Sequence, residues 1–199
     1  LGGAHKGHND SRNLWPELFR VVRETRPRAV IAENVKGLLR PSFKPYYDYI
    51  LNQLRAPFEK PRNSEDWTDH NQRISKFMER DNVDLTERYH VKFHLVNAAD
   101  YGVPQVRWRV FVVAFRRDLG LQDWEFPKET HSEDELLRAQ FDGSYWEEHK
   151  VPKTYRKPPK SAPATDGKTK RWRTLRDALK GDPERGEPKL PEPIGDKIE

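Results

Sequence analysis

The chain has 199 residues, of which 34% are hydrophobic and 35% are charged, so it can bury only a modest core. It contains no cysteine, which excludes disulfide bonds and thiolate metal sites, and no apolar run approaches the length of a membrane span. The formal net charge is +5, and residues 150–180 hold eleven Lys/Arg against two Asp/Glu. Such a basic segment favours a polyanionic partner, but its charge is equally typical of a solvated disordered tail.

The N-terminal part of the chain predicts a loop and then a helix. Residues 1–13 are glycine-rich and polar, which is typical of a loop. Apolar residues then recur at helical spacing from Leu14 to Val22, with Asn13 placed to cap the helix and Pro27 placed to end it.

A strand and a second helix are predicted next. The apolar run Ala29–Ala32 predicts a short buried strand, which leads directly into Glu33 and Asn34. After Pro41, apolar residues spaced from Phe43 to Leu54 predict a second amphipathic helix.

Residues 57–88 form a highly charged insertion, in which Trp67, Ile74, Phe77 and Met78 predict a surface helix. This insertion separates the first predicted strand from the two that follow it.

Two strands follow the insertion. Alternating apolar residues from Tyr89 to Leu95 predict a half-buried strand, and the run Val110–Phe115 predicts a buried one. From Pro127 onward prolines and charges dominate and periodicity fades, except that Leu175, Ala178 and Leu179 predict a short amphipathic helix.

Polar side chains border two of the predicted strands. Glu33 and Asn34 follow the first, whereas Gln105, Arg107 and Arg109 lead into the last. Open α/β sheets bind ligands at the carboxyl ends of their strands, so Glu33 is poised for chemistry. A glutamate and two arginines can hold one polar planar ring by its edge. The sequence therefore predicts an α/β fold that carries part of a pocket.

Three segments carry a family resemblance: DSRNLWPELFRVV at 10–22, Glu33-Asn34-Val35, and Gln105-x-Arg107-x-Arg109. In this order and spacing they resemble motifs of the DNA cytosine-5 methyltransferase family, in its bacterial form. The resemblance is close over about residues 1–115. Beyond that, only WRTLRDAL at 172–179 resembles the family, in the target-recognition region of its bacterial members.

The resemblance implies the second half of a Rossmann-like, S-adenosylmethionine-dependent methyltransferase domain, followed by part of a target-recognition region. Residues 1–116 would be the C-terminal half of the catalytic domain, and residues 117–199 the partial recognition region. The family's nucleophilic Pro-Cys loop would end almost where this chain begins, and the main cofactor-binding motif is also absent from the sequence. The resemblance therefore implies that this chain is a fragment of such an enzyme and is inactive alone.

The resemblance also implies roles in methyl transfer to C5 of a cytosine flipped from duplex DNA. In the family a thiolate adds to C6, and negative charge then builds towards N3 and O2 of the ring. Glu33 would act at N3 as the general acid, and Arg109 would stabilise the developing charge at O2. Arg107 would orient Arg109 or bind phosphate, while Asn34 and Gln105 would brace the loops.

Further residues would bind cofactor or DNA. Leu14 matches a family leucine that touches the adenine of the cofactor. A leucine that only packs in the core is equally consistent with the sequence. Lys6 in the N-terminal loop would suit a phosphate. Four basic residues near Trp172 mix phosphate-seeking charge with an apolar anchor and are predicted DNA contacts: Lys168, Lys170, Arg171 and Arg173.

The implied partners are duplex DNA and the missing N-terminal half of the enzyme, in the same chain or a separate one. The implied setting is the bacterial cytoplasm and a restriction–modification system, with no membrane partner. Two alternatives stay open: a tRNA cytosine-5 methyltransferase on the same scaffold, or a non-catalytic DNA-binding or assembly subunit. His5 and His8 lie in the predicted loop and do not predict a metal site.

Overall fold

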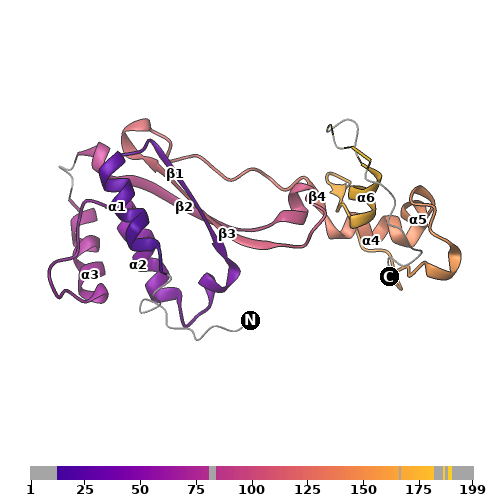
Figure 1. The fold of residues 1–199 in the computed structure, drawn as a ribbon, viewed down its shortest axis with the longest axis horizontal. Coiled ribbons are helices and arrows are strands. Elements are labelled where there is room, and N and C mark those ends of the chain that lie inside the picture. Colours follow the sequence, from indigo (N-terminus) through magenta and orange to yellow (C-terminus); the bar gives the residue numbers. More distant parts are fainter. Residues whose placement is uncertain (1–12, 81–83, 166, 182–185, 187, 190–199) are drawn as a thin grey trace. The chain divides into compact units, whose positions relative to one another are not determined.

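The computed structural model describes residues 13–80, 84–165, 167–181, 186 and 188–189 (Figure 1). They form two compact units. Unit 1 joins the described residues up to Leu95 with Arg109–Phe126, and unit 2 joins Val96–Trp108 with the described residues from Pro127 onward. The sequence predicted a single division between residues 116 and 117. The contact-based units are described by other bounds: unit 1 continues to Phe126, and unit 2 includes the segment Val96–Trp108, which carries Gln105 and Arg107.

Unit 1 is built on a three-stranded sheet with the order β1–β3–β2 (Figure 1). The strands are β1 Ala29–Val35, β2 Tyr89–Asn97 and β3 Trp108–Arg116. β1 and β3 run antiparallel, with Ala29 opposite Phe115 and Val35 opposite Arg109. The predicted first strand ended at Ala32, whereas β1 continues through Glu33 to Val35 because β3 pairs with it over its full length.

Helices α1 Trp15–Thr25 and α2 Lys44–Arg55 pack on one face of the sheet (Figure 1). The Asn13 side-chain oxygen accepts a hydrogen bond from the Trp15 backbone N–H at 3.2 Å, and Arg26 ends α1 in the left-handed conformation. Both predicted helices are confirmed. Alternate strand residues supply the sheet side of the core, because successive side chains of a strand point to opposite faces: Val30, Val110, Val112 and Ala114.

The charged insertion contains α3, Trp67–Met78, as predicted, but this helix does more than cover the surface. Ile74 and His70 are fully buried, and Ile74 packs in a second small core with Tyr49 of α2. His70 also shares a 2.9 Å hydrogen bond with the Tyr49 hydroxyl. Arg73 pairs with Glu59 and Glu65 at 2.7 and 2.9 Å. Part of the charge of the insertion is therefore balanced by ion pairs between its own side chains.

The opposite face of the sheet is only partly covered. Trp124 packs against Phe115 with ring centroids 5.2 Å apart, and its carbonyl accepts a hydrogen bond from Lys92. At the β1 edge, Ile31 and Val35 remain 71% and 56% exposed. An outer strand that displays apolar side chains is a site where another chain segment can pair.

Unit 2 has shorter elements. β4 His131–Ser132 pairs in parallel with β5 Lys170–Arg171, and the helices are α4 Glu133–Asp142, α5 Ser144–Glu148 and α6 Leu175–Lys180. Its small core consists of Tyr145, Trp146 and Val151. Helix α6 confirms the prediction made from Leu175, Ala178 and Leu179.

Short 3-10 turns connect these elements: η2 Lys36–Leu39, η3 Leu85–Glu87, η4 Ala98–Tyr101, η5 Arg117–Leu119 and η6 Lys153–Tyr155. The mixture of helices and sheets confirms the predicted α/β class. Within the described ranges, no helix has the length and apolar character needed to cross a bilayer.

Candidate functional site

Glu33 and Arg109 lie side by side on adjacent strands of unit 1. Glu33 stands opposite Phe111 in the β1–β3 register, and Arg109 stands two residues before Phe111, on the same face of the sheet. Diagonal neighbours on one sheet face are within reach of long side chains. The Arg109 Nε and the Glu33 Oε1 are accordingly 2.6 Å apart. The structure therefore brings together the two residues that the sequence predicts to act on the base.

This pair is open to solvent on the less covered face of the sheet, with 44% of the Glu33 side chain and 23% of the Arg109 side chain exposed. An ion pair at this exposure contributes about 0–1 kcal/mol to stability. It can be rearranged at little cost when a ligand enters. A carboxyl group beside a guanidinium can meet the edge of a planar heterocycle that carries both hydrogen-bond donors and acceptors.

Gln105 and Arg107 belong to unit 2, and both side chains are exposed. Their loop is closed at its base by Asn97, which is buried. The Asn97 side-chain oxygen accepts hydrogen bonds from the backbone N–H groups of Arg107 at 3.0 Å and Ala99 at 3.3 Å. The Gln-x-Arg-x-Arg motif is therefore divided between the units, with Arg109 in unit 1 and the other two residues in unit 2.

The remaining predicted residues of unit 1 have simpler surroundings. Asn34 is half-buried, and its side-chain oxygen accepts from the Val35 backbone N–H at 2.8 Å. Leu14 stands at the start of α1 and is 72% exposed. It is not a core leucine within this chain. Lys6 lies outside the described residues.

The predicted DNA-contacting residues of unit 2 fall into two groups. Lys168 and Lys170 are exposed, and Arg173 is half-buried, with a 3.5 Å hydrogen bond from its Nη1 to the Gly102 carbonyl. Arg171 is different, because its guanidinium donates to Asp177 at 2.6 Å and to Glu148 at 2.9 Å. Its charge is already balanced inside the unit.

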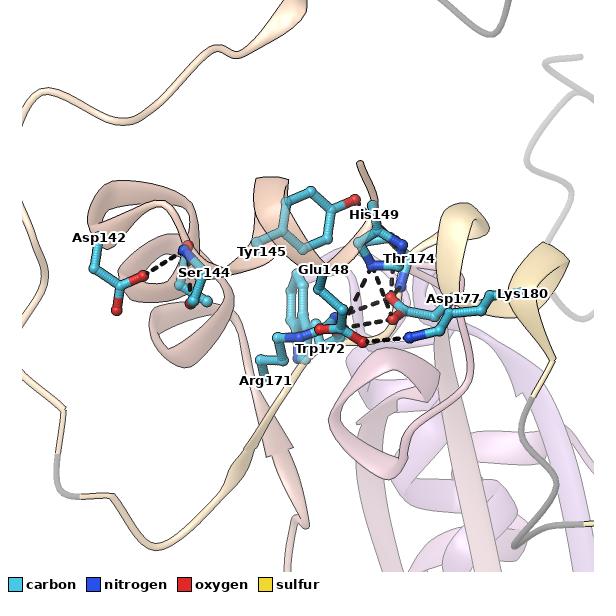
Figure 2. Close-up of polar contacts among 11 residues, drawn as sticks. Asp142, Ser144, Tyr145, Glu148, His149, Arg171, Trp172, Thr174, Asp177 and Lys180 are labelled. Atoms are coloured by element: carbon cyan, nitrogen blue, oxygen red, sulfur yellow. Dashed lines mark hydrogen bonds and ion pairs between the residues drawn. The ribbon is translucent and has the colours of Figure 1, made fainter. Parts of the chain in front are cut away.

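Figure 2 shows this ion-pair network around Arg171 and Asp177. Asp177 also accepts hydrogen bonds from the Thr174 N–H and hydroxyl at 2.7 and 2.8 Å, which caps α6, and its carboxylate lies 3.2 Å from His149 Nε2. Burial opposes ionisation of Asp177, but the hydrogen bonds from His149, Arg171 and Thr174 outweigh it and hold its pKa far below the ordinary value. The hydrogen bonds that Arg171 donates to Asp177 in turn raise the pKa of Arg171.

Ligand atoms of Glu148, His149 and Asp177 lie within 4.8 Å of one another, a spacing that a metal ion could bridge. Arg171 pairs with both carboxylates, however, and Lys180 pairs with Glu148 at 3.1 Å. We therefore interpret the cluster as a structural ion-pair network. The sequence did not point to Glu148 or His149; the only available signal was Thr174-x-x-Asp177, the pattern of a capping box.

Comparison with known proteins places the sequence of this chain in a family. Residues 1–56 and 63–181 match the sequence model of the family described as C-5 cytosine-specific DNA methylase. The chain is 31% identical over 137 residues to the Type II methyltransferase M.HgiCII of Herpetosiphon aurantiacus, which covers 68% of this chain and 24% of that protein.

Two further relatives give the same result. M.HhaI of Haemophilus parahaemolyticus is 30% identical, with 64% of this chain and 30% of that protein aligned. M.AquIA of Picosynechococcus sp. is 33% identical, with 66% and 43% aligned. The chain thus spans less than half the length of each of these relatives. Because the family match covers most of its residues, the chain belongs to the C-5 cytosine-specific DNA methylase family.

Proposed function

We propose that this chain is part of a DNA (cytosine-5-)-methyltransferase that transfers a methyl group from S-adenosylmethionine to C5 of a flipped cytosine in duplex DNA. The single observation that carries the proposal is the Glu33–Arg109 pair, held at 2.6 Å on adjacent strands in a member of this family. The relatives are Type II methyltransferases by name, which supports a restriction–modification setting and, with it, the bacterial cytoplasm.

The pair suits the edge of a cytosine ring. The ring presents an exocyclic amine, N3 and O2 along one edge, so Glu33 would hold N3 and the amine while Arg109 donates to O2. When a nucleophile adds to C6, negative charge builds towards N3 and O2. Glu33 would supply or share a proton at N3, and Arg109 would stabilise the charge at O2. Arg107 would orient Arg109 or bind backbone phosphate, and Asn34 and Gln105 would brace the loops.

The nucleophile must come from another part of the enzyme, because the sequence contains no cysteine and serine or threonine lacks the nucleophilicity of a thiolate at neutral pH. We propose that the part supplying it continues the sheet at the free edge of β1, as the other half of a Rossmann-like domain. Three observations support this placement: β1 is an edge strand of the described sheet, Ile31 and Val35 are exposed there, and the chain spans less than half of the length of its relatives.

The residues of this chain fit only the border of a cofactor site. Leu14 offers an exposed apolar side chain at the start of α1, suited to one face of an adenine ring. We propose that the missing half supplies the polar contacts. S-adenosylmethionine would supply the methyl group, and Leu14 would limit where its adenine lies.

We propose that Lys168, Lys170 and Arg173 of unit 2 contact DNA phosphates, and that Lys6, which lies outside the described residues, does so too. Arg171 is better suited to holding the unit together than to contacting DNA, because it pairs with Asp177 and Glu148. Residues 117–199 would thus belong to a target-recognition region, with residues 96–108 grouped beside them.

The test joins this chain to the N-terminal half that carries the Pro-Cys loop and supplies labelled S-adenosylmethionine. Three substrates are compared: duplex DNA with cytosine, the same duplex with 5-methylcytosine at every cytosine, and tRNA. The proposal predicts label in the first substrate only, and none when the 199-residue chain is used alone. Label in tRNA would favour the RNA enzyme, and no label in any substrate would favour a non-catalytic DNA-binding subunit.

A further inference from the structure

Within unit 2, the turn η4 and Gly102 form hydrogen bonds with residues next to the paired strands β4 and β5. The Trp172 indole N–H donates to the Asp100 carboxylate at 2.7 Å, and the Thr130 backbone N–H donates to the Asp100 carbonyl at 2.9 Å. Arg173 adds the 3.5 Å hydrogen bond to the Gly102 carbonyl. Two consecutive side chains of the WRTLRDAL segment therefore contact one turn.

The packing at this turn leaves no space for a side chain at position 102. Gly102 has a φ of +83°, which favours glycine, and a Cβ built there would lie 2.6 Å from Cε1 of the buried His131. The turn is thus pressed against the start of β4. The position of the turn therefore depends on β4 and on its neighbour β5, which contains Lys170 and Arg171.

The same turn begins the loop that carries Gln105 and Arg107. Asn97 closes the base of this loop through its hydrogen bonds to Ala99 and Arg107. Trp172 holds the loop at Asp100, on the side that precedes Gln105. The loop is thus held at Asn97 and at Asp100, while the side chains of Gln105 and Arg107 are exposed.

Trp172 is itself held by the residues on either side of it. Its backbone N–H donates to the Ser132 carbonyl at 3.0 Å, Arg171 before it pairs with Asp177 and Glu148, and Thr174 after it caps α6 (Figure 2). The indole is therefore presented to Asp100 from a segment fixed by ion pairs and a helix cap. Trp172 connects the ion-pair network with the Gln105–Arg107 loop.

We propose that Trp172 is a positioning residue for methyl transfer, which sets the place of Gln105 and Arg107 through its hydrogen bond to Asp100. The proposal rests on the function proposed above. It assigns to the WRTLRDAL segment a task besides DNA contact: Trp172 would fix the position of the loop that carries Gln105 and Arg107.

The first experiment measures amide hydrogen exchange in the 199-residue chain. Trp172→Phe removes the indole N–H and keeps an aromatic ring, so exchange in the peptide covering residues 98–107 should rise. Trp146→Phe is the matched control, because the Trp146 indole N–H donates to the Gln140 carbonyl at 2.7 Å in the same unit but away from this loop. Unchanged exchange in Trp172→Phe, or an equal rise in both variants, would overturn the proposal.

The second experiment measures turnover by the enzyme joined to its N-terminal half. Because small misplacement of positioned groups slows reaction more than binding, kcat should fall about tenfold in Trp172→Phe while the KM for duplex DNA stays within about twofold. Trp146→Phe should leave both constants near wild type. Asp100→Asn keeps an acceptor oxygen and should retain most turnover, whereas Asp100→Ala should behave like Trp172→Phe.

Wild-type kcat in Trp172→Phe and Asp100→Ala would overturn the positioning role. A wild-type enzyme that transfers no methyl group would overturn the proposed function instead. The exchange measurement would still decide whether Trp172 holds the loop, so the two failures can be told apart.

Discussion

The two units of this chain are stabilised by different forces. Unit 1 buries a continuous core between its sheet and the helices α1 and α2, of eleven and twelve residues. Unit 2 has a buried core of only Tyr145, Trp146 and Val151, and much of its order comes from the ion pairs of Arg171. The contrast shows that a charged segment can hold a specific structure when its charges are paired and shielded from solvent.

The same contrast separates two arginine–carboxylate pairs. Asp177 and Arg171 are 12% and 22% exposed, and further hydrogen bonds surround them. Glu33 is 44% exposed, and its ion pair with Arg109 lies on an open sheet face. The first pair is largely shielded from solvent and holds unit 2 together, whereas the second is accessible from solvent.

The largest expected effect is on the structural pair. Asp177→Asn leaves Arg171 with Glu148 as its counter-ion, and losing a charged hydrogen-bonded partner in a half-buried pair costs about 1.5–3 kcal/mol. Urea unfolding of the 199-residue chain, followed by the fluorescence of unit 2 tryptophans, measures this loss. Asp48→Asn is the control, because Asp48 pairs with Lys44 on the exposed face of α2 and should cost about 0.5 kcal/mol. Equal losses in the two variants would contradict the structural role of the network.

The second effect concerns the arginines of the divided motif. Arg109→Ala removes the donor proposed for O2, so turnover of the joined enzyme should fall on the order of 10²-fold. Arg107→Ala should cost less, because Arg107 is expected to act through Arg109 or through phosphate. Steady-state kinetics on duplex DNA compares them, and a larger loss in Arg107→Ala would reverse the ranking.

The third effect is the salt dependence of DNA binding. Neutralising Lys168, Lys170 and Arg173 together should weaken duplex binding and reduce the slope of log affinity against log salt by about 2–3, at roughly 0.9 per phosphate contact. Arg171 is left in place because its loss would disturb the fold. Titrations at several salt concentrations measure the slope. A slope equal to that of the wild-type chain would assign these residues to solvent.

The smallest effect is the alkaline stability of unit 1. Burial raises the pKa of Tyr49 to about 12, above the value of about 10 in an unfolded chain. Below pH 10 Tyr49 is protonated in both states and unit 1 keeps its full stability. As the pH rises from about 10 to about 12, the hydroxyl ionises more readily in the unfolded chain, which costs unit 1 about 1.4 kcal/mol by pH 11. Tyr49→Phe should flatten this loss in urea unfolding, and Tyr155→Phe, at a 67% exposed residue, should not. Parallel pH curves for wild type and Tyr49→Phe would contradict this account.

Sequence periodicity predicted the elements of unit 1 because long amphipathic helices and alternating strands leave a clear pattern, as in α2 and β2. It missed the extension of β1 through Glu33 because polar residues end the apolar run, and the extension depends on distant β3. In unit 2 the pattern of α6 was readable, but β4 and β5 have only two residues each and α5 only five, too few to show a period.

The candidate site was predictable to a similar extent. The residue types of Glu33 and Arg109 pointed to a pocket, and the family resemblance supplied their roles. Their contact depends on the pairing of strands far apart in the chain, which no local pattern contains. The ion pair of Arg171 with Glu148 was missed for the same reason, since Glu148 lies on α5 and is remote in sequence.

The central claim is that the Glu33 carboxyl acts in methyl transfer and is not merely one half of a surface ion pair. The most direct measurement is kcat of the joined enzyme carrying Glu33→Gln, with duplex binding and thermal unfolding recorded beside it. Glu87→Gln is the matched control, because Glu87 forms a 3.1 Å ion pair with Arg26 elsewhere in unit 1. We expect kcat to fall by about 10²-fold or more in Glu33→Gln, with little change in duplex binding or unfolding temperature, and no such fall in Glu87→Gln. Near-normal turnover in Glu33→Gln would show that Glu33 is structural and would contradict the account.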